Sequence, residues 1–168
     1  MARKKVILIG NPILRKKSEE LTPGDPEADI IIQDLADTLR DLQRIKKIGR
    51  ALAAPQIGVL KRIVFCNLPN RSMALINPKI TWHSKETFDV WDSCFSFDVQ
   101  FFVEVKRFIS IELSYFDETW KEKREVFEGD MAELLQHELD HLQGVLATDK
   151  MIDSSKIIMR QEWEERYR

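Results

Sequence analysis

The sequence predicts an α+β fold, in which helices flank antiparallel or mixed sheets within a single domain formed by residues 1–168. Three observations support this prediction. An apolar helical pattern lies near the beginning of the chain, the middle is rich in strand-forming segments, and a second helical pattern follows them. A length of 168 residues without an internal repeat fits one domain of ordinary size.

The first predicted helix follows a loop at residues 21–26 that is rich in Pro and Gly. Asp25 precedes Pro26, and a proline suits the first helical position because its missing N–H would have no intrahelical partner there. Gly49 is the predicted end of the helix. The apolar residues on one side are spaced by three and four positions, as a helix requires: Ile31, Leu35, Leu39, Leu42 and Ile45.

The middle of the chain predicts a sheet, because its apolar and β-branched residues alternate or form short runs. A turn is expected at residues 117–119 between the last two strands. The predicted strands are residues 62–67, 73–77, 101–105, 108–116 and 124–127.

Two further helices are predicted after these strands. Residues 131–144 form the first, with Asp130 as N-cap and Glu133 three positions later, as in a capping box. Gly144 is a fitting C-terminal stop. Residues 154–167 form the second predicted helix.

The charge balance excludes some classes of partner. The chain has 26 basic and 28 acidic residues, so it lacks the basic excess typical of nucleic-acid-binding proteins. The apolar run at residues 6–9 is too short for a signal-peptide core or a membrane span. We therefore expect a cytoplasmic protein with no membrane partner and no specificity for nucleic acid.

The strongest chemical signal is the segment Gln136-His-Glu-Leu-Asp-His141. On a helix, His137 and His141 project from nearly the same face, where two imidazoles can bind one metal ion. Glu138 lies beside the first histidine and can reach a water on that metal, as in the His-Glu-x-x-His arrangement of metal hydrolases. The alternative is a surface helix with incidental histidines. A separate apolar stripe, formed by Leu135, Leu139 and Leu142, anchors the helix and leaves the histidines free for function.

A catalytic metal needs a third protein ligand and an open position for water. No histidine follows His141, and the carboxylates of the last predicted helix lie on a solvated face. Cys94 lies in a turn rich in Ser and Asp, and a thiolate with two imidazoles is a known catalytic ligand set. The alternative for Cys94 is a small buried residue, as we expect for Cys66 at the end of a strand.

The segment Gly49-Arg-Ala-Leu-Ala-Ala-Pro-Gln56 is small and mostly apolar, so a ligand can approach its backbone closely. Gln56 is a side chain there that can donate a hydrogen bond to an oxyanion without adding charge. The alternative is a tight packing corner between a helix and a strand, with Gln56 at the surface.

Taken together, the three segments resemble the motifs of the peptide deformylase family. That family carries Gly-x-Gly-Leu-Ala-Ala-x-Gln, Glu-Gly-Cys-x-Ser and Gln-His-Glu-x-Asp-His in this order. The chain has Gly49-Arg-Ala-Leu-Ala-Ala-Pro-Gln56, Asp92-Ser-Cys-Phe-Ser96 and Gln136-His-Glu-Leu-Asp-His141. Gly10-Asn-Pro-Ile-Leu-Arg15 also matches the Pro-x-Leu-Arg with which the family opens, so the resemblance covers nearly the whole chain.

The resemblance implies sheets around a central metal-binding helix and removal of formate from the N-formyl-methionyl ends of nascent chains. It implies one divalent metal, natively ferrous iron with zinc, nickel or cobalt as substitutes. It assigns the ligands Cys94, His137 and His141, the acid/base Glu138, and the oxyanion donors Gln56 and the backbone N–H of Phe95. The positions expected near the substrate are Gly49, Arg50, Ala51, Ser93 and Glu133.

The chain departs from the family pattern around these motifs. Ala51 replaces the second glycine of the first motif, and Asp92-Ser93 replaces Glu-Gly. We expect Asp92 to pair with Arg107, as the family glutamate pairs with a downstream arginine. Arg50 and Glu133 occupy positions near the methionine pocket that are often apolar in the family. These departures indicate a divergent member whose metal chemistry is intact.

Two other functions are compatible with the residues. One is a zinc endopeptidase of the general His-Glu-x-x-His kind, which would not use Cys94 as a ligand. The other is a degenerate homologue that binds metal or peptide ends without turnover. The last predicted helix would contact the ribosome, as in related enzymes, or would form a solvated face of mixed charge.

Overall fold

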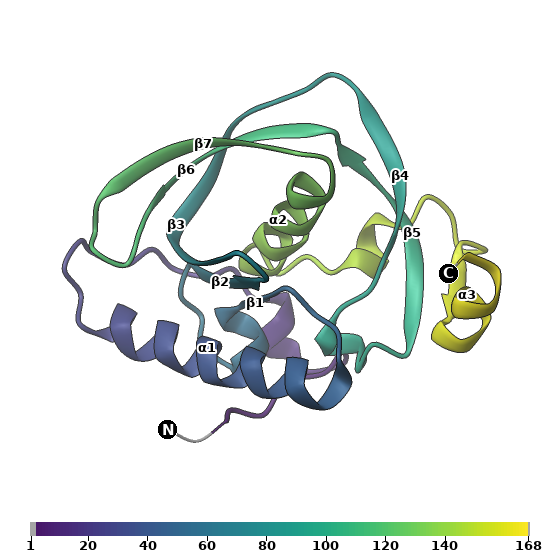
Figure 1. Ribbon diagram of the computed structural model, residues 1–168, viewed down its shortest axis with the longest axis horizontal. Helices are drawn as coiled ribbons and strands as arrows, with labels where there is room; N and C mark the ends of the chain where they lie inside the picture. The colour runs from purple at the N-terminus through teal and green to yellow at the C-terminus, as the bar shows by residue number, and fades with distance from the viewer. Residues whose placement is uncertain (1–2, 168) are drawn as a thin grey trace.

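The computed structural model describes residues 3–167 (Figure 1), so Met1, Ala2 and Arg168 of the predicted single domain lie outside the described part. It contains a five-stranded sheet in the order β1-β2-β3-β6-β7 and a three-stranded sheet in the order β4-β5-β8. All the strand pairs in both sheets are antiparallel. The predicted α+β fold is therefore confirmed.

In the larger sheet, each strand pairs with the next strand of the chain, except that β3 pairs with β6 because β4 and β5 belong to the smaller sheet. Its strands are β1 (Ala51–Ala53), β2 (Ile63–Leu68), β3 (Arg71–His83), β6 (Ser110–Phe116) and β7 (Glu122–Glu128). The smaller sheet contains β4 (Thr87–Asp92), β5 (Phe101–Phe108) and β8 (Ile157–Met159). Short 3-10 helices, η1 (Pro12–Arg15), η2 (Ala54–Ile57), η3 (Phe95–Phe97) and η4 (Ala147–Lys150), join the larger elements.

The first helix, α1 (Glu27–Lys46), packs its apolar side against β1 and β2. Pro26 is its N-cap, and the Asp25 carboxylate accepts a hydrogen bond of 2.9 Å from the Glu27 N–H. The helix ends at Lys47, which adopts a left-handed conformation with φ 58° and donates its N–H to the Gln43 carbonyl. The predicted end at Gly49 is thus two residues late, because a non-glycine residue makes the cap.

Several strand predictions need correction. The strand predicted at residues 73–77 extends from Arg71 to His83. It continues past Pro78 because a register shift follows Ile76, where Asn77 takes a positive φ of 52°. The strand predicted at residues 108–116 begins at Ser110, and Phe108 ends β5 instead. Strands β1, β4 and β8 were not predicted.

The predicted helix at residues 154–167 is wrong in its first half. Residues 157–159 form β8, which pairs with β5 in the order Phe101 with Met159 and Val103 with Ile157. Helix α3 (Arg160–Tyr167) begins only after this strand. The sequence Ile-Ile-Met fits either structure, and pairing with an available sheet edge decides in favour of the strand.

Helix α2 (Gly129–Leu142) lies in the middle of the molecule and contacts both sheets, through β1, β5 and β7 (Figure 1). Its apolar stripe of Leu135, Leu139 and Leu142 packs in a core with residues of β2, β3 and β6, as predicted. No helix among residues 3–167 is long and apolar enough to cross a membrane.

Both ends of α2 differ in detail from the prediction. Glu128 is the N-cap and makes no capping hydrogen bond with its side chain, so the predicted capping box of Asp130 and Glu133 is wrong. Both acids pair with an arginine instead, as described below. Gly144 has a φ of 74°, and a Cβ there would lie 2.5 Å from the Arg15 carbonyl oxygen. Only glycine therefore fits the turn that follows the helix, as predicted.

Candidate metal centre and active site

Three metal-ligating side chains meet at the inner face of α2. His137 and His141 come from consecutive turns of the helix, and Cys94 comes from the turn between β4 and η3. Their ligand atoms all lie within 4.8 Å of one another, and all three residues are buried. The predicted ligands are thus brought together, and Cys94 adjoins both histidines, which disfavours an endopeptidase centre that makes no use of a thiol.

The geometry of this cluster fits a divalent metal. The Nε2 atoms of His137 and His141 are 3.2 Å apart. Two nitrogens that bind one tetrahedral cation at about 2.0–2.1 Å lie about 3.3 Å apart. Burial and the neighbouring His137 lower the pKa of His141, so this imidazole is neutral, as a metal ligand must be. One thiol and two imidazoles form a donor set that suits several transition metals.

An aspartate orients the first histidine. The Asp92 carboxylate lies 2.8 Å from His137 Nδ1, and both side chains are buried. Burial disfavours the charged imidazolium, but Asp92 outweighs that effect and raises the pKa of His137. Because Asp92 accepts a hydrogen bond from the Nδ1–H of His137, Nε2 is the nitrogen that faces the metal position, and a bound metal would displace the proton on Nε2.

A buried arginine holds this aspartate in place. Arg107 Nη2 lies 2.8 Å from Asp92, and Nη1 lies 2.5 Å from Asp140. The side chain of Arg107 is 1% exposed, whereas Lys150 reaches Asp140 from the surface at 2.9 Å. The predicted pairing of Asp92 with Arg107 is confirmed, and Asp140 pairs with the same arginine. The shorter aspartate thus still bridges Arg107 and His137.

Replacing Arg107 by leucine is expected to destabilise the metal-free protein by about 3–5 kcal/mol, because Asp92 and Asp140 lose their buried partner. Urea unfolding measures this change. Lys106→Leu is the matched control, since Lys106 pairs with Asp89 on the exposed side of the same strand. That control is expected to change stability by less than about 1 kcal/mol. Equal stability of the two variants would contradict this role of Arg107.

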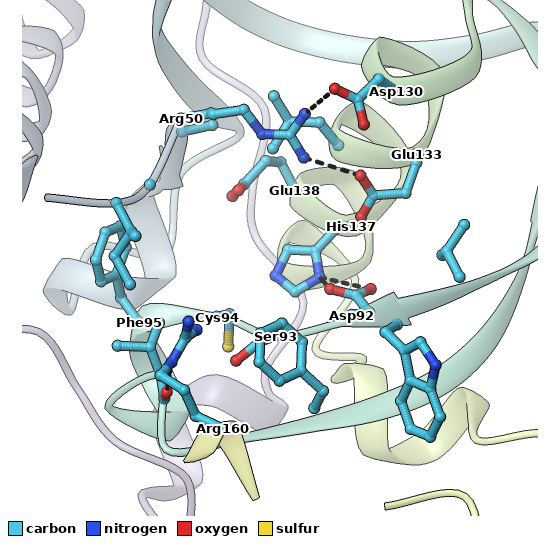
Figure 2. Close-up of a pocket in the computed structure, with 18 of the residues that line it drawn as sticks. Arg50, Asp92, Ser93, Cys94, Phe95, Asp130, Glu133, His137, Glu138 and Arg160 are labelled. Carbon is cyan, nitrogen blue, oxygen red and sulfur yellow. Dashed lines mark hydrogen bonds and ion pairs between the residues drawn. The ribbon is translucent and has the colours of Figure 1, made fainter. Parts of the chain in front are cut away.

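Glu138 lies on the same helix as the two histidines and borders the same cavity as Cys94 and His137 (Figure 2). Its residue is 3% exposed, and its Oε2 atom is buried without a hydrogen-bond partner. Burial raises the pKa of Glu138 to about 7. A carboxyl group with such a pKa and an unsatisfied oxygen is suited to exchange a proton with a small molecule beside it.

Gln56 is buried in η2 rather than at the surface. Its side-chain oxygen accepts a hydrogen bond of 2.9 Å from the Ala53 N–H, which fixes the orientation of the amide. The Nε2 group faces Ser96 Oγ at 3.3 Å and borders the cavity. Phe95 is the first residue of η3, where the N–H has no intrahelical partner. Gln56 and Phe95 therefore both line the cavity that Cys94 borders.

Gly49, which lies two residues before β1, and Ala51, the first residue of β1, both line the cavity. Gly49 has a φ of 102°, and a Cβ there would lie 2.2 Å from the Phe95 ring, so glycine is needed for Phe95 to pack. Ala51 pairs with Cys66 of β2, and β1 is the edge strand of its sheet, so no second strand among residues 3–167 pairs with Ala51. Ser93 lines the cavity, but its hydroxyl donates to the Phe101 carbonyl at 2.6 Å.

Arg50 and Glu133 form an ion pair in the cavity wall (Figure 2). Arg50 Nη2 lies 2.9 Å from Glu133 Oε2, and Nη1 lies 2.8 Å from Asp130 Oδ2. Burial, followed by the charge of Asp92, raises the pKa of Glu133, whereas Arg50 lowers it. The substrate positions expected from the sequence are thus all found around one cavity.

The cavity has a volume of about 300 Å³, and part of its lining was missed from the sequence. Phe88, Val90 and Trp91 of β4 line it, together with Phe102 of β5 and Arg160 of α3. The Arg160 guanidinium lies 4.6 Å from the centre of the Phe102 ring, and its Nε donates to the Val99 carbonyl at 2.5 Å. The alternation of residues 87–92 was a signal for β4, whereas no local pattern indicated Arg160.

The second cysteine has a separate role. Cys66 is fully buried in β2, and burial raises the pKa of its thiol. Neither cysteine forms a disulfide. Cys66 is therefore a core residue, as predicted, and Cys94 alone of the two lies beside the histidines.

Comparison with known proteins gives one consistent result. The family model described as polypeptide deformylase matches residues 3–156. The peptide deformylase of Brachyspira hyodysenteriae is 33% identical over 170 residues, covering 96% of this chain and 88% of that protein. The peptide deformylase of Pseudothermotoga lettingae is 36% identical over 159 residues, covering 95% and 89%.

Solved structures agree with these relatives. The crystal structure of peptide deformylase from Thermotoga maritima matches with a TM-score of 0.82 and 31% identity, over 91% of this chain and 100% of that one. A peptide deformylase from Synechococcus elongatus, solved in complex with actinonin, gives a TM-score of 0.82 and 29% identity, over 93% and 86%. With its buried Cys94, His137 and His141 site, the chain belongs to the peptide deformylase family of metal-dependent hydrolases.

Proposed function

We propose that this protein removes the formyl group from the N-formyl-methionyl ends of nascent peptides and releases formate, using the residues assigned below. One observation carries the proposal. Cys94 and His137 of the buried three-residue cluster line a cavity that Glu138 and Gln56 also line. Metal ligands, a proton-transfer group and an oxyanion donor are thus available to one bound amide.

Cys94, His137 and His141 would hold one divalent metal, for which we propose iron as the native ion and zinc, nickel or cobalt as substitutes. When bound, such a metal acts as a Lewis acid and lowers the pKa of its water to near neutrality. Three protein ligands leave a coordination position for that water. Asp92, held by Arg107, keeps His137 in the tautomer that binding requires.

Glu138 is proposed as the general base and acid. Its unpartnered oxygen accepts a proton from the attacking water and later gives it to the amine that leaves the formyl carbon. No other acid of α2 borders the cavity without a salt-bridge partner, since Asp130 and Glu133 both pair with Arg50. The surrounding burial excludes bulk water from this transfer.

Gln56 and the backbone N–H of Phe95 are proposed as the oxyanion donors. The Gln56 oxygen is bound to the Ala53 N–H, so the amide group must present its NH₂ to the cavity. A donor held in this way costs no reorganisation when negative charge develops on the formyl oxygen. Phe95 lines the same cavity from η3, and its N–H has no partner within that helix.

Gln56→Glu is expected to lower kcat by about 10²–10³-fold, because it removes the donor and keeps the oxygen that accepts from Ala53. Formate release measures this, with metal content determined for each preparation. Ser96→Ala is the control, since it removes only the 3.3 Å contact to Gln56 Nε2. The control is expected to retain kcat within about tenfold. Full kcat in Gln56→Glu would exclude this residue as a donor.

The peptide is proposed to lie along the open edge of β1, where the backbone of residues 49–51 can pair with an extended chain. Ser93 would line the opposite side of this site. Nascent chains are made in the cytoplasm, so we place the protein there. A ribosome contact through α3 stays a prediction.

The competing function is a degenerate homologue that binds metal or peptide without turnover. Formate release from formyl-Met-Ala-Ser by the iron-loaded protein, purified without oxygen, separates the two. We expect release that is lost after chelation and restored by ferrous iron. Binding of metal and peptide without any formate would support the degenerate homologue and overturn the proposed function.

A further inference from the structure

A groove lies against α2 apart from the active-site cavity. It has a volume of about 720 Å³ and shares no lining residue with that cavity. The rest of its lining comes from the segment between η1 and α1, from the residue before β2, and from β3, β5 and η4. The residues that line it from α2 are spaced by three and four, so they share one face of the helix: Gln136, Leu139, Asp140 and Gln143. The groove is therefore separate from the proposed active site.

Positive charge exceeds negative charge in the lining of this groove. Two of the cations there are paired, since Lys79 lies 2.9 Å from Glu20 and Lys150 lies 2.9 Å from Asp140. The other two cations, Arg62 and Lys17, have no ion-pair partner among residues 3–167. The groove thus contains two positive charges without a paired carboxylate.

Arg62 is the more unusual of these two residues, because its charge is buried. The residue is 6% exposed, and its Nη2 donates to the neutral Pro78 carbonyl at 2.6 Å. Its Nε is buried with no hydrogen-bond partner in the described part of the chain. Arg107, which is also buried, has two carboxylates as partners instead. A buried arginine without an anion has lost hydration and gained no compensating charge, so binding of an anion beside Arg62 would be favourable.

A serine hydroxyl accompanies these two cations. Ser18 is 4% exposed, and its N–H donates to the Leu142 carbonyl at 2.9 Å. Its Oγ has no hydrogen-bond partner within residues 3–167. Guanidinium, ammonium and hydroxyl groups all donate hydrogen bonds, and the first two are the usual partners of phosphate oxygens. The lining of the groove therefore suits an oxyanion.

We propose that this groove is a binding site for a phosphate group, with Arg62 and Lys17 as the residues that pair with it. A phosphate monoester carries a charge of about −1.5 to −2 at neutral pH and has three strong acceptor oxygens. It can therefore pair with both cations. A carboxylate carries a single charge, so it would leave one of the two unpaired.

The groove is larger than a phosphate ion, and part of its lining is apolar. Ile80 of β3, Phe108 of β5 and Leu139 of α2 provide this apolar surface. An organic group attached to the phosphate can lie against it. The probes are therefore inorganic phosphate, adenosine monophosphate, and adenosine as the compound that lacks the anion.

Calorimetric titration of the zinc-loaded protein measures the affinity for each probe, at low ionic strength because salt screens exposed charges. We expect phosphate affinity to fall about tenfold or more in Arg62→Leu and several-fold in Lys17→Met, since charge-assisted hydrogen bonds are lost. Lys16→Met is the matched control. Lys16 is an exposed lysine next to Lys17 but does not line the groove, so this variant should keep the wild-type affinity within about twofold.

The design keeps the inference independent of folding and of catalysis. Arg62 is buried, so the thermal unfolding and metal content of Arg62→Leu are measured before its titration. If that variant does not fold, the comparison of Lys17→Met with Lys16→Met decides, because both lysines are exposed. Formate release by Lys17→Met should equal that of the wild type, since the groove shares no residue with the active-site cavity.

Each outcome bears on the groove. Weaker phosphate binding in the groove variants alone supports the site. In that case, tighter binding of adenosine monophosphate than of inorganic phosphate assigns an organic phosphate as the ligand, and equal affinities assign the free ion. Equal phosphate affinity in the wild type and the groove variants would overturn the inference, because the anion would then bind elsewhere, as at the metal. Equal binding of adenosine and adenosine monophosphate, or no phosphate binding up to about 10 mM, would also overturn it.

Discussion

Glu138→Ala is expected to bind metal as the wild type does and to lose formate release by about 10²–10⁴-fold in kcat. The reason is that Glu138 lies beside the ligands without being one of them. Cys94, His137 and His141 form the cluster, whereas the Glu138 carboxylate borders the cavity with an unpartnered oxygen. Removing it takes away the proton acceptor and leaves the three donors in place.

Two measurements check this expectation. Elemental analysis gives the metal content, and a formate assay gives kcat. Glu138→Gln is the conservative companion, because it keeps the size of the side chain but cannot accept and return a proton at neutral pH. It is expected to be as inactive as Glu138→Ala. A variant that keeps one metal per chain and full turnover would exclude Glu138 as the acid/base.

Cys94→Ser is expected to weaken zinc affinity by at least about 100-fold. Loss of a residue that only hydrogen-bonds a metal ligand typically weakens affinity by about 10–100-fold. A hydroxyl is a far weaker ligand for zinc than a thiolate, so only the two imidazoles would hold the ion firmly. Competition with a chelator of known affinity measures the change.

Cys66→Ala is the matched control for this substitution. Cys66 is buried in β2, where it pairs with Ala51 of β1, and it belongs to a core of apolar residues. Its removal is expected to affect stability and leave metal affinity unchanged. A zinc endopeptidase centre would predict equal affinities for Cys94→Ser and the wild type, so this pair of variants also separates the two classes of enzyme.

The elements predicted correctly from the sequence are those with long periodic patterns. The spacing of Ile31, Leu35 and Leu39 predicted α1, and these residues are buried in the folded chain. The apolar stripe of α2 was equally clear. By contrast, β1 and β8 have three residues each and contain no full period of alternation. Pairing with a neighbouring strand defines them, and that partner is distant in the chain.

The metal site was accessible from sequence because its residue types are scarce and two of them share a helix. Three histidines occur in the chain, and two lie four positions apart. Cys94 was found by elimination and by the motif around it. Arg160 was not found, because it reaches the cavity from residues that follow the family match, through contacts with Val99 and Phe102.

At Glu133, a tertiary contact overrides the local capping pattern. Its spacing from Asp130 predicted a capping box, which would satisfy N–H groups at the start of α2. In the fold, Arg50 from the segment before β1 lies within 2.9 Å of both carboxylates. A charge-assisted pair across the cavity is stronger than a capping bond in water, so the acids face Arg50.

X-ray absorption spectroscopy of the zinc-loaded protein reads the ligand set of the bound ion itself. We expect one sulfur at about 2.3 Å, two imidazole nitrogens at about 2.0–2.1 Å and one further light atom in the first shell. A spectrum without sulfur, or with a third imidazole, would contradict a centre built from Cys94, His137 and His141.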